Sequence, residues 1–487
     1  MLFNSIDFLI FFPIVLIVFY IVPERFRYIW LLIASYYFYM QWNPAYALLL
    51  FGATAVTYVG ALILEKTSSV RIRKITLVTA IVIDLGFLCY FKYSVMFMGY
   101  INKILSITAH RQIPWDMNIV LPVGISFFTF QALGYLIDVY RGDTYAEHNF
   151  LRYALFISFF PQLVAGPIER SRNLLKQLAK PQKFSFENLK KGLFVMLYGF
   201  FMKVVIADRL AILVDTVFAD PVTWPGMYIL VASTAFTIQI YCDFYGYSTI
   251  ARGTALTMGI ELMDNFNAPY FARTISELWR RWHLSLSTWF RDYLYIPLGG
   301  NRKGTFRKYL NIMIVFAVSG LWHGASLSFV IWGALQGVFQ LIEAGVAFIR
   351  KKLGLRRGDG IISRILGAIV TFILFDISFI IFRSNSLTNL RVIIDRLFGD
   401  FDAGVLFDGS VLNLGISAGY MWVLLIALII FYAVDVIKYK TGDVRGWFFK
   451  RPLWFKCVSV VFLLTYIIVF GRYGGTYDVK QFIYFQF

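Results

Sequence analysis

Residues 276–324 read SELWRRWHLSLSTWFRDYLYIPLGGNRKGTFRKYLNIMIVFAVSGLWHG. An arginine-rich aromatic segment leads through a basic, glycine-containing turn into an apolar run that ends at Trp322, His323 and Gly324. His283 and His323 are two of the four histidines in the chain. Because an ionisable group at the end of a membrane-embedded segment is costly unless a cavity or a partner receives it, His323 is a candidate functional residue.

The rest of the chain is similarly apolar. Its 487 residues are 59% hydrophobic and 15% charged, with a mean hydropathy of +0.67, whereas about a quarter of the residues in a soluble domain are charged. Runs of the ~20 apolar residues that a spanning helix needs recur along the sequence. The expected fold class is an all-α polytopic integral membrane protein, and not an outer-membrane barrel of short alternating strands.

The sequence predicts a single membrane domain over residues 1–487, with about 11–12 transmembrane helices and both termini outside. We expect residues 151–168, which hold two prolines and a glycine, to form a re-entrant or interfacial piece covered by protein or water. Residues 258–308 are expected to lie at the cytoplasmic interface as short helices with tryptophans at head-group depth, followed by the histidine segment at 309–349. The candidate spans lie near residues 5–23, 28–42, 45–64, 74–92, 119–139, 192–212, 226–244, 309–323, 326–349, 361–382, 415–437 and 453–471.

The formal net charge of +18 admits two explanations. It could serve a nucleic-acid partner, or it could mark cytoplasmic loops beside anionic lipids. Lysines and arginines gather in short loops between the apolar runs, which favours membrane lipids as the partner and argues against nucleic acid.

Two explanations stay open for each histidine of the central stretch. A helix over residues 309–322 would rise roughly 21 Å, which would carry His323 past the middle of a ~30 Å hydrocarbon core. There it is either a packed side chain that donates to a carbonyl or a reactive base. His283 would share a helix face with Arg280 and Ser287, either on a solvated interfacial helix or as a second active-site histidine.

Asp243 is the carboxylate candidate. It follows Gln239 by one turn at the end of an apolar span, which indicates either an inward, water-accessible polar stripe or a helix end that snorkels to the interface. The remaining histidines, His110 and His148, lie in loops and are expected to be solvated.

Several familiar chemistries are missing from the sequence. It has no GxxxxGK(S/T) loop and no GxSxG elbow, which argues against a nucleotide-driven pump and an α/β-hydrolase. No HExxH or paired-histidine spacing suggests a metal site, and no bound cofactor is expected. A deep imidazole with arginines at the basic face suits a general base serving an anionic donor from the cytoplasm. The candidate substrate-binding residues are Asp243, Gln239, Arg280, Arg281, Trp282, Arg291 and Trp322.

Motifs spread over most of the chain carry a resemblance to a known family. They are Leu121–Gln131, Asp138–Gly142, Phe160–Ile168, Asp243–Ser248, Asn265–Tyr270, Phe290–Arg302, Leu321–Ala325, Phe382–Arg383 and Phe482–Phe487. With them the chain resembles the membrane-bound O-acyltransferase family, in its bacterial alginate O-acetylation branch. One departure is that family members often carry His-Gly shortly after a Trp-Gly pair, whereas Gln336 and Gly337 follow Trp332 and Gly333 here.

The resemblance implies a helical bundle around a central funnel, with His323 as the catalytic histidine and His283 as a second active-site histidine. It implies an acyltransferase that moves an acetyl group from a cytoplasmic thioester, acetyl-CoA, across the bacterial cytoplasmic membrane for O-acetylation of an extracytoplasmic polysaccharide. The expected partner is an extracytoplasmic SGNH-type acetyltransferase or the glycan acceptor itself.

Two alternatives stay open. The same fold would serve D-alanyl transfer from a phosphopantetheinyl carrier protein towards teichoic acid. A proton-coupled transporter would use His323 and Asp243 as a relay, although no pair of broken helices at matching positions in two halves of the chain favours it.

Overall fold

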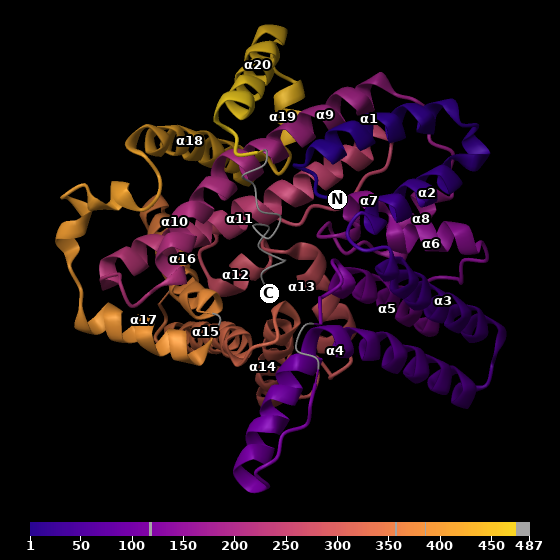
Figure 1. Cartoon of the computed structure of the whole chain (residues 1–487), viewed down its shortest axis with the longest axis horizontal. Coiled ribbons are helices and arrows are strands. Elements are labelled where there is room, and N and C mark those ends of the chain that lie inside the picture. The colour runs from indigo at the N-terminus through magenta and orange to yellow at the C-terminus, as the bar shows by residue number, and fades with distance from the viewer. Residues whose placement is uncertain (116–118, 356–357, 385, 474–487) are drawn as a thin grey trace. The chain divides into compact units, whose positions relative to one another are not determined.

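The computed structural model describes residues 1–115, 119–355, 358–384 and 386–473, so the predicted terminal motif Phe482–Phe487 lies outside the described residues. Every regular element in the described ranges is a helix (Figure 1), as predicted for an all-α membrane protein. The chain divides into two compact units, residues 1–193 with 251–263 and residues 194–250 with 264–487. The single domain over residues 1–487 therefore stays a prediction.

The first unit is built around α3, which packs against α4 and α5, while α2 packs against α6. Its helices are α1 (Ile6–Ile21), α2 (Arg27–Met40), α3 (Ala45–Lys66), α4 (Val70–Thr108), α5 (Ile125–Arg141), α6 (Phe150–Ser158), α7 (Phe160–Leu163) and α8 (Ser171–Leu178). Helices α9 (Phe186–Phe200) and α11 (Gly226–Thr257) each contribute residues to both units.

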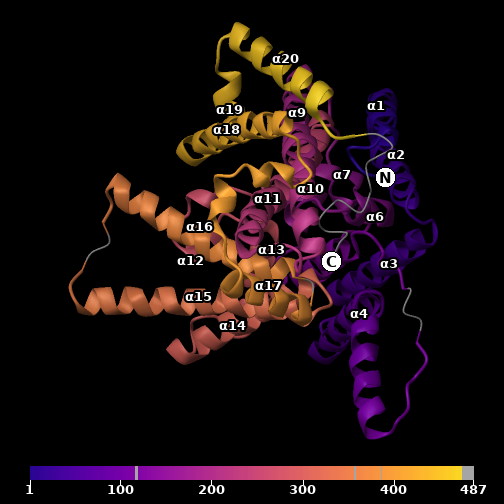
Figure 2. The ribbon, with the colours of Figure 1, turned by 60° about the vertical axis from the view of Figure 1, so that its left-hand side comes forward.

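Helix α4 is longer than predicted. It has 39 residues, which is about 58 Å at 1.5 Å per residue, and it continues to Thr108 although the apolar run fades near residue 92. Figure 2 shows its far end and the chain that returns from it standing away from α3. Asn102 joins the two, because its amide donates to the Ile113 carbonyl and accepts from the Ile113 N–H.

The segment predicted to be re-entrant forms two short helices, α6 and α7. At nine residues α6 rises about 14 Å, too short to cross a ~30 Å hydrocarbon core. All residues from Tyr153 to Glu169 are buried. The break in the helix is therefore covered by protein, as backbone at membrane depth requires.

The second unit holds the histidine stretch. Its further elements are the π-helical segment η2 (Phe201–Ala207), α10 (Asp208–Ala219), α12 (Ile275–Trp279), α13 (Leu284–Phe290), the π-helical segment η4 (Arg291–Tyr295), α14 (Gly304–His323), α15 (Leu327–Lys352), α16 (Ile361–Arg383), α17 (Leu387–Gly399), α18 (Ala418–Thr441), α19 (Val444–Phe449) and α20 (Leu453–Phe470). Helices α14 and α15 form an extensively packed hairpin, and α16 packs against α15 (Figure 2).

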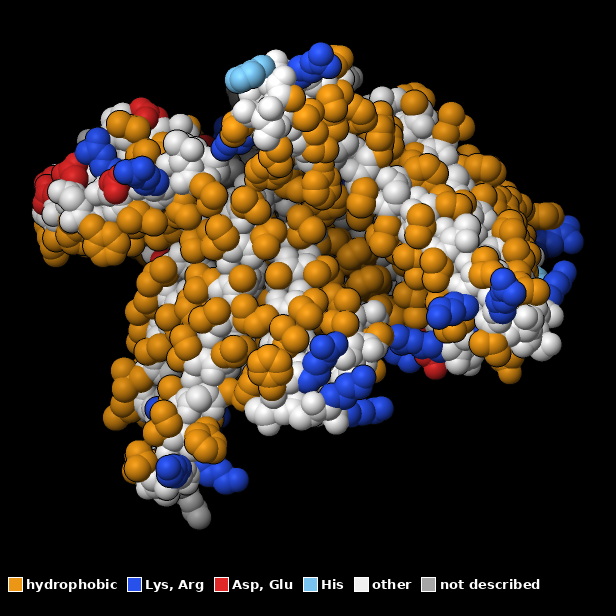
Figure 3. All heavy atoms as spheres, turned by 90° about the horizontal axis from the view of Figure 1, so that it is seen from below, with side chains coloured by type: hydrophobic (Ala, Val, Ile, Leu, Met, Phe, Trp, Pro, Cys, Tyr) orange, Lys and Arg blue, Asp and Glu red, His pale blue; other side chains and the backbone are white. Residues whose placement is uncertain are grey.

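Seven helices in the described residues are long and apolar enough to cross a membrane, namely α3, α4, α11, α15, α16, α18 and α20. Hydrophobic side chains cover most of the face in Figure 3, with lysines and arginines mainly at its margins. This supports the predicted multi-pass membrane protein. Each of the twelve candidate spans coincides with a helix, but the number of crossings stays a prediction.

Candidate functional site

His323 is the last residue of α14. The close packing of α14 on α15 follows from two glycines: a Cβ on Gly333 would lie 2.1 Å from the Phe316 oxygen, and one on Gly320 would lie 2.1 Å from the Phe329 oxygen. No other residue fits this approach, since real Cβ contacts are much longer. The two backbones therefore meet one turn before His323.

Aromatic rings surround the His323 imidazole, which is 9% exposed. The ring centroids of Trp322, Trp332 and Phe382 lie 5.0, 5.3 and 5.6 Å from it, each in an edge-to-face arrangement. The histidine therefore lies in largely apolar surroundings, where its electrostatic interactions are weakly screened.

His283 lies in the turn between α12 and α13 with φ 44°, in the left-handed region. The helix predicted through Arg280, His283 and Ser287 is therefore wrong. The first backbone N–H groups of α13 donate hydrogen bonds to Asn265 instead of continuing a helix from α12. The Asn265 carbonyl accepts from the Leu284 N–H at 2.9 Å, and its side-chain oxygen accepts from the Ser285 N–H at 3.2 Å.

The His283 side chain is 1% exposed, so the alternative of a solvated interfacial position is also wrong. Burial, and secondarily the charge of His323, hold the pKa of His283 well below its ordinary value of 6.5. The Trp322 ring lies 6.0 Å from the His283 ring and 5.0 Å from the His323 ring. The structure thus brings the three predicted residues together.

Asp243 lies in the middle of α11, because the helix continues past residue 244 to Thr257. It is 1% exposed, and the Lys203 Nζ lies 2.6 Å from its carboxylate and 2.8 Å from that of Asp208. The predicted snorkelling helix end is wrong, and the water-accessible stripe is instead a buried ion-pair cluster. Gln239 is buried one turn away, and its Oε1 has no hydrogen-bond partner among the described residues. The predicted substrate roles of Asp243 and Gln239 stay predictions.

A large cavity of about 2120 Å³, which we name the basic cavity, opens among α12 to α16. Of the predicted arginines, Arg280 and Arg291 line it, while Arg281 pairs with Glu277 at 3.0 Å. Trp282, like the other tryptophans expected at head-group depth, is buried within the unit. The cationic residues that line the cavity are Arg273, Arg280, Arg291, Lys308, Arg350 and Lys351, against the single carboxylate of Glu343.

A hydrogen-bonded layer that sequence reasoning missed lies between the basic cavity and His323. The Trp279 indole, which lines the cavity, donates to Gln336 Oε1 at 3.3 Å, and Gln336 Nε2 donates to Ser378 Oγ at 2.8 Å. The Trp279 ring also lies 6.0 Å from that of Trp332, which contacts His323. Only the unusual Gln336 after the Trp-Gly pair signalled this layer in the sequence.

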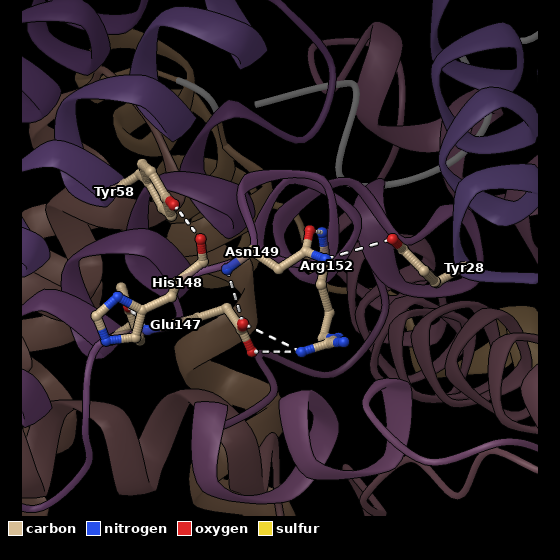
Figure 4. A network of polar contacts seen from close by, with 7 residues as sticks. Tyr28, Tyr58, Glu147, His148, Asn149 and Arg152 are labelled. Carbon is tan, nitrogen blue, oxygen red and sulfur yellow. Dashed lines mark hydrogen bonds and ion pairs between the residues drawn. The ribbon is translucent and has the colours of Figure 1, made fainter. Parts of the chain in front are cut away.

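The other two histidines are exposed, as predicted. His148, in the first unit, pairs through Nε2 with the Glu65 carboxylate at 2.9 Å. Figure 4 shows its neighbours Glu147 and Asn149 in a network with Arg152, in which Glu147 accepts from Arg152 at 3.2 Å. This network ties a loop to helices of the first unit.

Comparison with known proteins identifies a matching family and several similar proteins. The model of the membrane-bound O-acyltransferase family matches residues 146–382. The chain is 42% identical over 395 residues to a probable alginate O-acetylase, AlgI, of Pseudomonas aeruginosa, covering 80% of this chain and 73% of the relative. It is 33% identical to a peptidoglycan O-acetyltransferase of Helicobacter pylori, covering 76% and 73%. It is 28% identical to a teichoic acid D-alanyltransferase of Bacillus subtilis, covering 45% and 58%.

Proposed function

The chain is an O-acyltransferase that belongs to the membrane-bound O-acyltransferase family, and from that premise we propose that it transfers acetyl from acetyl-CoA to an acceptor outside the bacterial cytoplasmic membrane. The observation that carries the proposal is His323, packed among aromatic rings one helical turn beyond Ser319, which lines a cavity of cationic residues. Membership of an acyltransferase family also removes the basis for the transporter alternative.

The basic cavity supports an anionic donor. Six cations face one carboxylate there, which suits the phosphates of coenzyme A, and its volume exceeds the ~1,000 Å³ of most small-molecule pockets. The pantetheine arm would extend from this cavity towards His323. The relatives named for O-acetylation have higher identity than the D-alanyltransferase, and they favour an acetyl group.

In the proposed reaction His323 removes the proton from an acceptor hydroxyl, and the oxygen attacks the thioester carbonyl. His283, kept neutral by burial, would orient the donor or relay the proton. The acceptor is an extracytoplasmic polysaccharide, reached directly or through an SGNH-type acetyltransferase partner.

Replacing His323 by Ala tests the proposal. Loss of a general base should lower acetyl transfer from labelled acetyl-CoA by about 10²–10⁴-fold, with unchanged membrane level and melting temperature. His148→Ala, which changes an exposed loop histidine, is the matched control and should keep full activity. Full activity of the His323 variant would contradict the proposed role.

D-alanyl transfer is the second candidate, favoured by the Bacillus subtilis relative. The purified protein would be given labelled acetyl-CoA in one reaction and a D-alanyl-charged carrier protein in another. Label transfer from the carrier protein alone would replace acetyl-CoA as the donor.

A further inference from the structure

Three helices, α14, α15 and α16, line the basic cavity. Further along each helix, the same face carries one of the aromatic or imidazole rings grouped around His323. On α14, Ser319 lines the cavity and His323 follows one turn later. On α15, Phe339 lines it and Trp332 lies two turns nearer the helix start; on α16, the lining face continues to Phe382. A thioester arm that follows these faces would reach the pocket of His323 and Trp332.

Trp332, whose ring packs against His323, has an unused hydrogen-bond donor. Its side chain is 2% exposed, and its indole N–H has no acceptor among the described residues. Trp279 next to it donates its indole N–H to Gln336, so tryptophans of this region can be satisfied by the protein. Buried N–H groups are nearly always bonded, so an unused donor on the ring beside His323 calls for an acceptor atom.

The Trp332 donor is also held in place. The glycine contact between Gly320 and Gly333 fixes α14 against α15, and the ring lies 5.3 Å from His323 at an interplanar angle of 89°. A second ring, Phe379, stacks against Trp332 at 14°. A donor held rigidly beside a base, in surroundings of low polarity, stabilises charge that develops during reaction.

We propose that the Trp332 indole N–H donates to the carbonyl oxygen of the transferred acyl group, an inference that rests on the proposed function. His323 takes the proton of the acceptor hydroxyl, the new O–C bond forms, and the carbonyl electron pair moves onto oxygen, where the Trp332 N–H meets it. When the C–S bond breaks, that pair returns to the carbonyl, and the thiolate takes the proton from His323. The indole keeps its own proton throughout.

Trp332→Phe removes the N–H and keeps an aromatic side chain. It should lower kcat for acetyl transfer by about 10- to 100-fold and leave KM within about threefold, because the bond strengthens in the transition state. Trp224→Phe removes an indole N–H that donates to the Thr216 carbonyl, and it should leave kcat unchanged. Turnover of the Trp332 variant within about twofold of wild type would overturn the inference.

Different results would overturn the proposed function and the proposed role of Trp332. An active His323→Ala enzyme overturns the proposed function, whereas an inactive His323→Ala with a fully active Trp332→Phe overturns only the Trp332 role. The carbonyl stretch of a ¹³C-labelled ketone analogue of acetyl-CoA gives a second measurement. It should have a lower frequency when bound to wild type than when bound to Trp332→Phe. If that variant does not fold, the carbonyl frequency of the wild-type complex is compared with that of the free analogue in an aprotic solvent, which donates no hydrogen bond. Equal frequencies would overturn the proposal.

Discussion

At the scale of a residue, Lys203 shows how a charge is kept inside a membrane protein. It lies in a π-helical turn, is 2% exposed, and is shared by Asp208 and Asp243 at 2.8 and 2.6 Å. Removing one member of a buried ion-pair cluster leaves uncompensated charge, which costs about 3–5 kcal/mol. The cluster therefore fixes α11 against the start of α10.

Lys203→Met should lower the free energy of unfolding by about 3–5 kcal/mol, measured by denaturant unfolding in detergent micelles. Adding Asp208→Asn and Asp243→Asn should recover most of this loss, because it removes the stranded carboxylates. Lys190→Met, which breaks an exposed pair with Glu187, should change stability by less than about 1 kcal/mol. A Lys203 variant as stable as wild type would show that the cluster carries no such energy.

At the scale of an element, the α14–α15 hairpin positions the reaction pocket. Gly333 meets the Phe316 carbonyl of α14, whereas Gly345, further along the same helix, has open space around its Cβ position. The two glycines therefore give a matched comparison of backbone approach within one helix.

Gly333→Ala should separate the two helices and lower stability by about 1–3 kcal/mol. It should also lower acetyl transfer by about 10²-fold, because small displacements of reacting groups are costly. Gly345→Ala should leave both unchanged. Melting temperature and turnover of the two variants check this, and equal activity of both would contradict a positioning role for the glycine contact.

At the scale of the whole molecule, one buried carboxylate outside the spanning helices makes stability depend on pH. Glu169, in the loop after α7, accepts from the Met263 N–H at 2.6 Å and from the Asn173 amide at 2.8 Å. Burial raises the pKa of Glu169 from 4.5 to about 7. As pH rises, the folded protein thus keeps the Glu169 proton to a higher pH than the unfolded chain does.

The pKa of Glu169 is higher in the folded than in the unfolded protein. The contribution of Glu169 to the free energy of unfolding should therefore be fully present below about pH 4.5 and be lost as pH rises to about 7. Glu169→Gln should reduce the difference in melting temperature between about pH 5 and about pH 8. Glu261→Gln, at an exposed position of the same unit, is the control. An unchanged pH difference in the Glu169 variant would exclude this carboxylate as the cause.

Local pattern predicted much of this fold. Hydropathy located the helices, and the apolar run before His323 is helix α14, which ends at that residue; its depth in the membrane stays a prediction. The helix predicted through His283 was wrong because Asn265 takes the donors of Leu284 and Ser285, a tertiary contact that helical periodicity does not contain. The helix end predicted at Asp243 was wrong because Lys203, from another helix, pairs with the Asp243 carboxylate inside the protein. The catalytic and substrate-binding roles stay predictions.

Trp332 and Ser378 were missed for the same reason. Each looks like an ordinary helix residue in sequence, and its meaning comes from partners on other helices, while Gln336 stood out only as a departure from the family pattern. Periodicity assigns a residue to a face of its helix, but it does not say which side chain it meets there.

The length of α4 has a practical consequence for imaging. A helix of about 58 Å is nearly twice the thickness of a ~30 Å hydrocarbon core, so unless it is steeply tilted part of it stands clear of the lipid. A small rigid protein fused in helical register at that end would move with the helix. It would give single particles of this membrane protein a landmark for alignment in electron cryo-microscopy.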